Sequence, residues 1–373
     1  MEWLRYFTET ASPLKNPEII AWKEAGKRII GTVCSNIPEE VLHAAGLLPV
    51  RLRAPGLHDT SNADSQLHRI NCSYTRSILE ELLRGDLEFL DGIITTNTCD
   101  HMLRLAGEIQ DQAGVFVHYF SMYHTLGNAA AEWFVREMER LIARVEESFG
   151  VEVAERNLRQ SIAVYNRTRE LMAGINELRK KDPPAVSGAE YLRIVLSGMS
   201  GPKERFNDRI EALLPELRNR RAGEAGLPRL MIVGGACDCP EFIDFIERKG
   251  ASIVADALCF GARHYLGTIK EDSASPLRAI ADRYISRPAC PSIIDGFEHS
   301  YRILRQFIQD WRVQGIICAR LKFCDHWGGA RKMLADELRK EGIPLLDLER
   351  EYAATGSGQI NTRVQAFLEM LRG

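Results

Sequence analysis

The sequence predicts an α/β fold of two lobes, each with a parallel sheet flanked by helices, joined by a helical segment. Short apolar runs alternate with helical stretches in both halves of the chain, as in strand-helix-strand units. Long amphipathic stretches separate the two halves. A buried strand followed by Cys-Asp-His and a helix occurs twice, in GIITTNTCDHMLRLAGEI and in GIICARLKFCDHWGGARKML.

The chain has 373 residues, more than one hydrophobic core usually supports. We therefore predict an N-terminal α/β lobe at residues 1–127, a helical connecting segment at 128–221 and a C-terminal α/β lobe at 222–373. The polar, glycine-bearing stretch RNRRAGEAGLPR is typical of a linker and places the second boundary.

In the first lobe, KRIIGTV predicts a strand, a helix begins near Pro38 and ends at Gly46, and LLPVRL predicts the next strand. IITT and VFVHYFSMY predict two further strands, with a helix between them that begins near Cys99. Residues 128–221 show apolar positions three and four apart, which predicts long helices.

The second lobe repeats this pattern. MIVGG and SIVAD predict two strands around a helix that begins near Pro240 and stops at Gly250. GIICARL and IPLLDLE predict two more strands around the helix that follows Cys324. Because parallel sheets bind ligands at the carboxyl ends of their strands, we expect Cys99 and Cys324 in equivalent loops facing one cleft.

Composition and charge limit the function classes. The formal net charge is -3 and there is no basic stripe, so we expect no binding to nucleic acid. No run of eighteen apolar residues and no secretion signal is found in the sequence, so we expect no membrane association and a cytoplasmic location. No GxxxxGK[ST] motif is present, so any ATP hydrolysis would belong to a partner chain.

Nine cysteines are more than packing in a reducing compartment requires. Six of them follow apolar runs or stand beside Gly, Pro or Asp, whereas Cys318 lies inside a predicted strand and is expected to be a packing residue. Without CxxC pairs, structural zinc is disfavoured, while an iron-sulfur cluster accepts thiolates from separate loops. A reactive cysteine with a histidine base stays open. The six candidates are Cys34, Cys72, Cys99, Cys259, Cys290 and Cys324.

Five stretches together resemble the superfamily of 2-hydroxyacyl-CoA dehydratases and benzoyl-CoA reductases, which includes the double-cubane cluster reductases. They are GTVCSNIPEEVLHAAGLLPVRL, NCSYTRSILEELLRGDLEFLDGIITTNTCDHMLRL, GASIVADALCFGARHYLG, GIICARLKFCDHW and GSGQINTRVQAFLEML. The resemblance implies that Cys72, Cys99 and Cys324 hold one [4Fe-4S] cluster with an open iron. It implies as the alternative that Cys34, Cys259 and Cys290 also bind, giving a double-cubane [8Fe-9S] cluster.

The resemblance also implies a function and partners. The expected function is that of an iron-sulfur subunit of an anaerobic reductase of the benzoyl-CoA reductase type, acting on an aromatic or acyl-CoA thioester. An ATP-hydrolysing iron-sulfur activator protein would supply single electrons, and an identical or homologous subunit would complete a dimer. The alternatives are a double-cubane reductase of a small substrate without CoA, a 2-hydroxyacyl-CoA dehydratase subunit, and a non-catalytic electron-transfer subunit. His101 and His326 are the first candidate proton donors, followed by His118 and His124.

Overall fold

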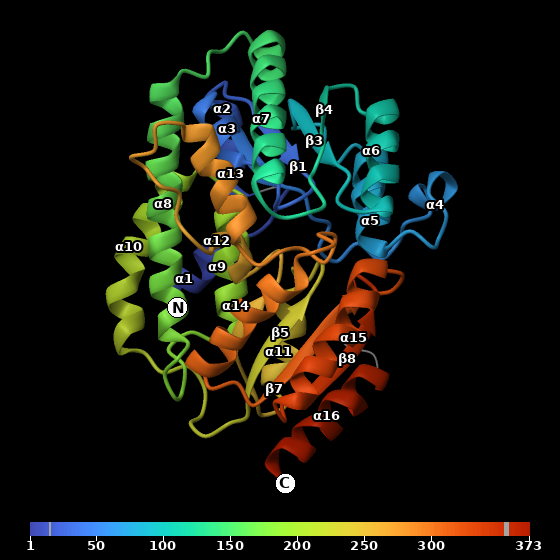
Figure 1. Ribbon diagram of the computed structural model, residues 1–373, viewed down its shortest axis with the longest axis vertical. Coiled ribbons are helices and arrows are strands. Elements are labelled where there is room, and N and C mark those ends of the chain that lie inside the picture. The colour runs from blue at the N-terminus through green and yellow to red at the C-terminus, as the bar shows by residue number, and fades with distance from the viewer. Residues whose placement is uncertain (15, 354–357) are drawn as a thin grey trace.

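The computed structural model describes residues 1–14, 16–353 and 358–373, and it confirms the predicted α/β class. Two four-stranded parallel sheets form the two lobes, with strand orders β2-β1-β3-β4 and β6-β5-β7-β8 (Figure 1). All eight strands lie where the sequence predicts them. They are β1 (Ile29–Thr32), β2 (Leu48–Arg51), β3 (Gly92–Thr96), β4 (Phe116–Phe120), β5 (Arg229–Gly234), β6 (Ser252–Ala257), β7 (Gly315–Leu321) and β8 (Leu345–Arg350).

Helices cover both faces of the sheets and fill the segment between the lobes (Figure 1). They are α1 (Glu2–Thr10), α2 (Pro17–Glu24), α3 (Glu39–Ala44), α4 (Ala63–Gln66), α5 (Ser73–Leu83), α6 (Asp100–Gln112), α7 (Asn128–Phe149), α8 (Glu155–Leu178), α9 (Gly188–Gly198), α10 (Lys203–Asn219), α11 (Pro240–Glu247), α12 (Ala262–Tyr265), α13 (Pro276–Ser286), α14 (Phe297–Asp310), α15 (Asp325–Lys340) and α16 (Gly358–Arg372).

The two sheets have the same topology. In each, the first strand pairs with both the second and the third, so Ile30 of β1 lies between Pro49 of β2 and Gly92 of β3. The second strand of each sheet is added on one side of the first strand, and the third and fourth strands are added on the other side. The direction of strand addition therefore reverses between β1 and β3 and between β5 and β7. Such a reversal opens a crevice at the carboxyl ends of the strands.

The helices at 128–219 connect the lobes as the periodicity predicts, although the exact domain boundaries stay a prediction. Helix α8 packs against α3 of the first lobe and against α12 of the second. Two buried ion pairs strengthen this joint: Arg169 contacts Glu40, and Lys203 contacts Glu39 at 2.9 Å. The connecting helices thus fix the two lobes relative to each other.

The sequence pattern does not predict the connection between β6 and β7 in any detail. It carries α12, α13 and α14, and it corresponds to the connection between β2 and β3, which carries α4 and α5. Helices α14 and α15 cover one face of the second sheet, where Val233 and Val254 pack beneath Leu304 and Leu338. This connection also brings Cys290 to the same end of its sheet as Cys324.

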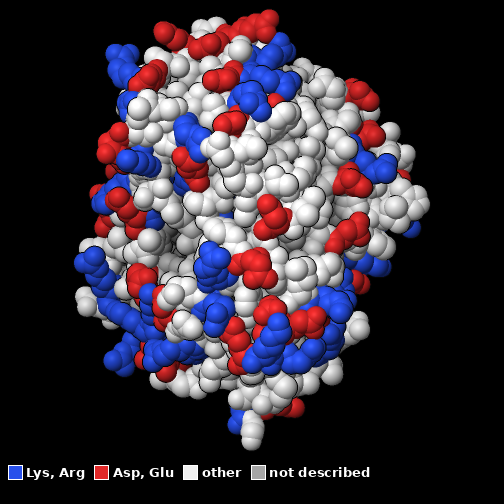
Figure 2. Space-filling model, in the orientation of Figure 1, with Lys and Arg blue, Asp and Glu red and all other residues white. Residues whose placement is uncertain are grey.

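The surface carries charges of both signs. Lys and Arg side chains intermingle with Asp and Glu on the face shown in Figure 2, where the described residues form no continuous basic stripe. Among residues 1–14, 16–353 and 358–373, no helix has both the length and the apolar character that a membrane crossing requires. In the last of the five resembling stretches, Gly356 and Ser357 lie outside the described residues.

Candidate functional site

Three cysteines stand at the N-termini of helices. Cys72 is the N-cap of α5, Cys99 is the N-cap of α6 and Cys324 is the N-cap of α15. The sulfur of Cys99 accepts a hydrogen bond from the amide of Met102 over 3.4 Å. Because the unpaired amides and the dipole at a helix N-terminus favour negative charge, all three positions suit a thiolate or an anionic group that a thiolate holds.

The same three thiols lie close to one another and to Cys290. Burial raises the pKa of Cys99 well above its usual value, and the charges of Cys72, Cys324 and Cys290 raise it further. Burial likewise raises the pKa of Cys324 to about 12, with Cys72 and Cys290 adding to the effect. The structure thus brings together thiols from both lobes, as the sequence predicted for Cys99 and Cys324.

Cys34 and Cys259 extend this group on the other side of Cys290. Burial raises the pKa of Cys259 to about 11, Arg263 and Arg51 oppose the rise, and Cys34 and Cys290 add to it. The six cysteines therefore form one continuous array of free thiols, with Cys290 adjoining both subsets. We call it the six-cysteine array, and it consists of Cys34, Cys72, Cys99, Cys259, Cys290 and Cys324.

The other three cysteines have different surroundings. Cys318 is fully buried inside β7, which agrees with its assignment to packing. Cys237 is also fully buried, and burial raises the pKa of its thiol while Arg350 opposes the rise. Cys239 faces the carboxylate of Glu241 at 3.5 Å. These three form a natural control set for the array.

The donor set fits a polynuclear cluster better than a single ion. Within the described residues, no three His, Cys, Asp or Glu side chains form a group that could hold one metal ion. The thiols of the array are nevertheless near enough to raise one another's pKa. Neighbouring thiols from separate loops suit an iron-sulfur cluster, whose irons each take a separate ligand, better than a single tetrahedral zinc ion.

Two candidate proton donors border the array. His101 accepts a hydrogen bond at Nδ1 from the backbone N–H of Cys72 over 3.2 Å, so its neutral ring carries its proton on Nε2. Burial lowers the pKa of His101, although Asp325 and Asp100 oppose this. His326 is half-buried, and burial lowers its pKa as well. Both rings are held close to the thiols that follow β3 and β7.

The two other histidines differ in position. His118 is buried in β4, and burial together with Arg140 and Arg144 lowers its pKa to about 4. His124 lies nearer the array, with Nδ1 3.2 Å from the carbonyl oxygen of Ser292. In the aromatic stretch around His118, Phe120 and Tyr123 belong to the core, so the stretch does not line a substrate cavity.

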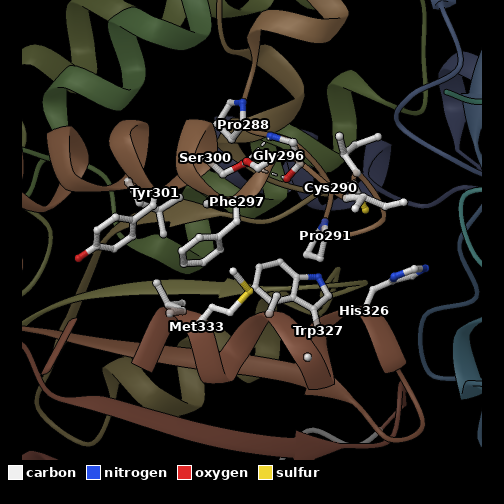
Figure 3. Close-up of a pocket in the computed structure, with 18 of the residues that line it drawn as sticks. Pro288, Cys290, Pro291, Gly296, Phe297, Ser300, Tyr301, His326, Trp327 and Met333 are labelled. Atoms are coloured by element: carbon white, nitrogen blue, oxygen red, sulfur yellow. Dashed lines mark hydrogen bonds between the residues drawn. The ribbon is translucent and has the colours of Figure 1, made fainter. Parts of the chain in front are cut away.

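An apolar cavity of about 300 Å³ adjoins the array between residues 288–304 and α15. Figure 3 shows Trp327 and Met333 of α15 directed toward Phe297 and Pro291 on the opposite side, with Cys290 and His326 at one end. Sequence reasoning missed this cavity. Trp327 directly follows the Cys-Asp-His motif, which was the available signal, but the opposite wall comes from a connection that lacks clear periodicity.

The glycine pair after β5 serves packing. A Cβ atom on Gly234 would lie 2.0 Å from the carbonyl oxygen of Ala319, and one on Gly235 would lie 3.3 Å from Trp327. These contacts let β5 approach β7 and Trp327 closely, which explains both glycines without a bound nucleotide. Arg76, which lies on α5 after Cys72, is an ion-pair residue that contacts Asp64 at 2.7 Å.

Comparison with known proteins agrees with this geometry. Residues 34–371 match the family model described as 2-hydroxyglutaryl-CoA dehydratase, D-component. The chain is 29% identical to the Escherichia coli K12 protein YjiM, named as a candidate dehydratase subunit, over 94% of this chain and 93% of that one. It is 26% identical to one of the subunits of benzoyl-CoA reductase from Thauera aromatica, over 91% of this chain and 89% of that subunit.

A third relative, the (R)-phenyllactyl-CoA dehydratase beta subunit of Clostridium sporogenes, is 22% identical over 98% of this chain and 99% of its own. The relatives include both dehydratase and reductase subunits, so the similarity covers more than one reaction. The match of the family model begins at Cys34 and runs nearly to the C-terminus, and it includes every residue of the six-cysteine array. The chain belongs to the 2-hydroxyglutaryl-CoA dehydratase D-component family.

Proposed function

We propose that the chain is the cluster-bearing subunit of a low-potential reductase in which the six-cysteine array holds a double-cubane [8Fe-9S] cluster. The observation that supports this most is that the charge of Cys290 acts on Cys99 and Cys324 and also on Cys259, on which the charge of Cys34 acts as well. When bound, such a cluster supplies single electrons at low potential. The substrate would be a compact molecule whose apolar part enters the cavity beside Cys290.

The surrounding residues supply the other requirements of such a reduction. His101, with its proton on Nε2, and His326 at the end of the cavity would donate protons as electrons arrive. The apolar side chains of Trp327, Phe297 and Met333 exclude water from the reacting substrate. The N-termini of α5, α6 and α15 favour the negative charge that the cluster carries.

The electrons would come from a partner. Because the sequence lacks a phosphate-binding GxxxxGK[ST] motif, an ATP-hydrolysing iron-sulfur activator is the proposed source of single electrons. The phenyllactyl-CoA dehydratase and benzoyl-CoA reductase relatives are named as subunits, which supports a second, identical or homologous subunit here as well. Gel filtration with and without the activator would test both associations.

A second candidate function is acyl-CoA chemistry at one [4Fe-4S] cluster held by Cys72, Cys99 and Cys324. Reduction of an aromatic or acyl-CoA thioester and dehydration of a 2-hydroxyacyl-CoA both fall under this candidate. Two observations favour it: four of the known relatives carry CoA esters in their names, and the cavity accepts an apolar acyl group. The number of iron atoms per chain separates this candidate from the leading one.

The deciding experiment counts anaerobic iron and acid-labile sulfide per chain and records EPR spectra of the reduced protein. The test variant combines Cys34→Ala, Cys259→Ala and Cys290→Ala, and the matched control combines Cys237→Ala, Cys239→Ala and Cys318→Ala. We expect about eight irons in wild type and control, and about half in the test variant. About four irons in all three proteins would favour the second candidate. A wild type that takes up no iron would overturn both.

A further inference from the structure

Arg51, at the end of β2, is a buried arginine that pairs with no carboxylate among the described residues. Only 4% of its surface is exposed, and within the described residues its Nε and Nη1 have no hydrogen-bond partner. Its guanidinium lies 4.8 Å from the ring centre of Phe260. Burial lowers the pKa of Arg51, but Tyr74, Cys34 and Cys259 more than offset this and raise it overall.

Two further buried arginines lie beside the same thiols. Arg287 donates from Nη2 to the carbonyl oxygen of Ser35 over 2.7 Å, while its Nη1 has no partner within the described residues. Burial lowers the pKa of Arg287, and Cys34 is among the groups that oppose this. Arg263 lines the apolar cavity and lowers the pKa of Cys259. No side-chain hydrogen bond or ion pair involves Arg263 in the part of the chain that the structure describes.

Among the described residues, three other buried arginines pair with carboxylates, while Arg229, Arg283 and Arg350 donate to backbone carbonyl oxygens instead. Arg169 contacts Glu40, and Arg179 lies 2.9 Å from Asp256. Arg53, only two residues from Arg51, lies 3.5 Å from Asp238. Because an unpaired charge is costly to bury, arginines are retained in a protein interior where an opposite charge balances them. Beside the array, within the described residues, no carboxylate forms an ion pair with Arg51, Arg263 or Arg287.

We infer that Arg51, Arg263 and Arg287 form a cationic cradle that balances the negative charge of the cluster portion held by Cys34, Cys259 and Cys290. This inference rests on the proposed function. An iron-sulfur cluster with thiolate ligands is an anion, and each added electron makes it more negative. Positive charge buried beside it favours the reduced state, so the cradle raises the reduction potential and strengthens retention of the cluster.

If the cradle balances the cluster, removing the charge of Arg51 should not destabilise the iron-free protein but should weaken the iron-loaded one. Arg51→Met keeps most of the apolar stem and removes the charge, whereas Arg51→Lys keeps a positive charge. The matched control is Arg53→Met, which removes a compensated arginine from the same segment of chain. In thermal unfolding of the iron-free protein, we expect Arg51→Met to match or exceed wild type in melting temperature. We expect Arg53→Met to lower it, because Asp238 is left unpaired.

The iron-loaded proteins provide the second measurement. In EPR-monitored redox titrations, we expect Arg51→Met to shift the midpoint to lower potential and to lose iron faster to a chelator. Arg51→Lys should restore most of the wild-type potential. Iron-free Arg51→Met that melts well below wild type would identify Arg51 as a structural residue and overturn the cradle. An unchanged potential together with unchanged iron release would overturn it too, while a wild type without iron would overturn the proposed function itself.

Discussion

Cys99 and Cys324 occupy equivalent positions in the two halves of the molecule. Each follows the third strand of its sheet, β3 or β7, and each is the N-cap of the next helix. The charge of Cys324 contributes to the raised pKa of Cys99, so the two thiols lie near each other although they come from different lobes. The repeated Cys-Asp-His motif thus marks one shared site approached from two sides.

Replacement of either residue should therefore have the same effect on iron content. Under the proposed function, we expect Cys99→Ala and Cys324→Ala each to lose most of the bound iron after anaerobic reconstitution, because each would remove a ligand from the same cluster. Cys318→Ala is the control, since Cys318 is buried within β7, and it should keep the wild-type iron content. Iron content that falls in only one of the two test variants would contradict the shared site.

The buried ion pair between Arg169 and Glu40 should be important for stability. Arg169→Met leaves the carboxylate of Glu40, which is fully buried, without its partner, and we expect a loss of about 3–5 kcal/mol in the free energy of unfolding. Arg167→Met is the control on the same helix, because Arg167 is half-exposed and pairs with Glu211 at the surface. It should change stability by less than about 1 kcal/mol. Urea unfolding measures both, and equal losses would contradict the prediction.

His118 should make stability depend on pH. Its folded-state pKa is about 4, whereas the ordinary value for histidine is 6.5, so the unfolded chain binds a proton that the folded chain does not. The stability that comes from keeping His118 neutral is fully present above pH 6.5. It is lost progressively as the pH falls toward about 4, and the free energy of unfolding then decreases by at most about 3 kcal/mol. Urea midpoints across this range should vary less in His118→Gln than in wild type. Parallel curves for the two proteins would refute this.

The two glycines after β5 should respond differently to alanine. Gly234 has a φ of +150°, and its added Cβ would meet the backbone of Ala319, which has no freedom to withdraw. We expect Gly234→Ala to lose more than about 2 kcal/mol of stability or to fail to fold. Gly235→Ala meets only the Trp327 side chain, so its loss should be clearly smaller. Thermal unfolding compares the two, and similar melting temperatures would argue against the close approach.

Much of the fold follows from local pattern. The eight strands are short β-branched runs that end at turn residues, and the helices at 128–219 have regular apolar spacing, so both are visible in the sequence. The connection between β6 and β7 is different. Its short helix α12 and the stretch around Cys290 are held by contacts with distant residues, such as Ile294 N–H donating to the carbonyl oxygen of His124 over 2.8 Å. Contacts between residues far apart in the chain cannot be predicted from the local sequence pattern.

The cysteines of the candidate site were visible because they follow apolar runs or stand beside Gly, Pro or Asp. The arginines were not visible. Arg51 ends a buried strand, where a charged residue usually signals an exposed edge, and its burial depends on Phe260 in the other lobe. The cavity likewise needs two walls from separate segments, α15 and residues 288–304. Tertiary packing therefore decides the charge and shape of the site, while sequence indicates its ligands.

Each lobe contributes three cysteines to the array: Cys34, Cys72 and Cys99 from the first, and Cys259, Cys290 and Cys324 from the second. The three cysteines of the second lobe are synthesised after the whole first lobe. Under the proposed function, neither half can hold the complete cluster alone, so cofactor insertion must follow translation and docking of both halves. Iron loading would then report on maturation, because only a protein whose two lobes have folded and docked could bind the complete cluster.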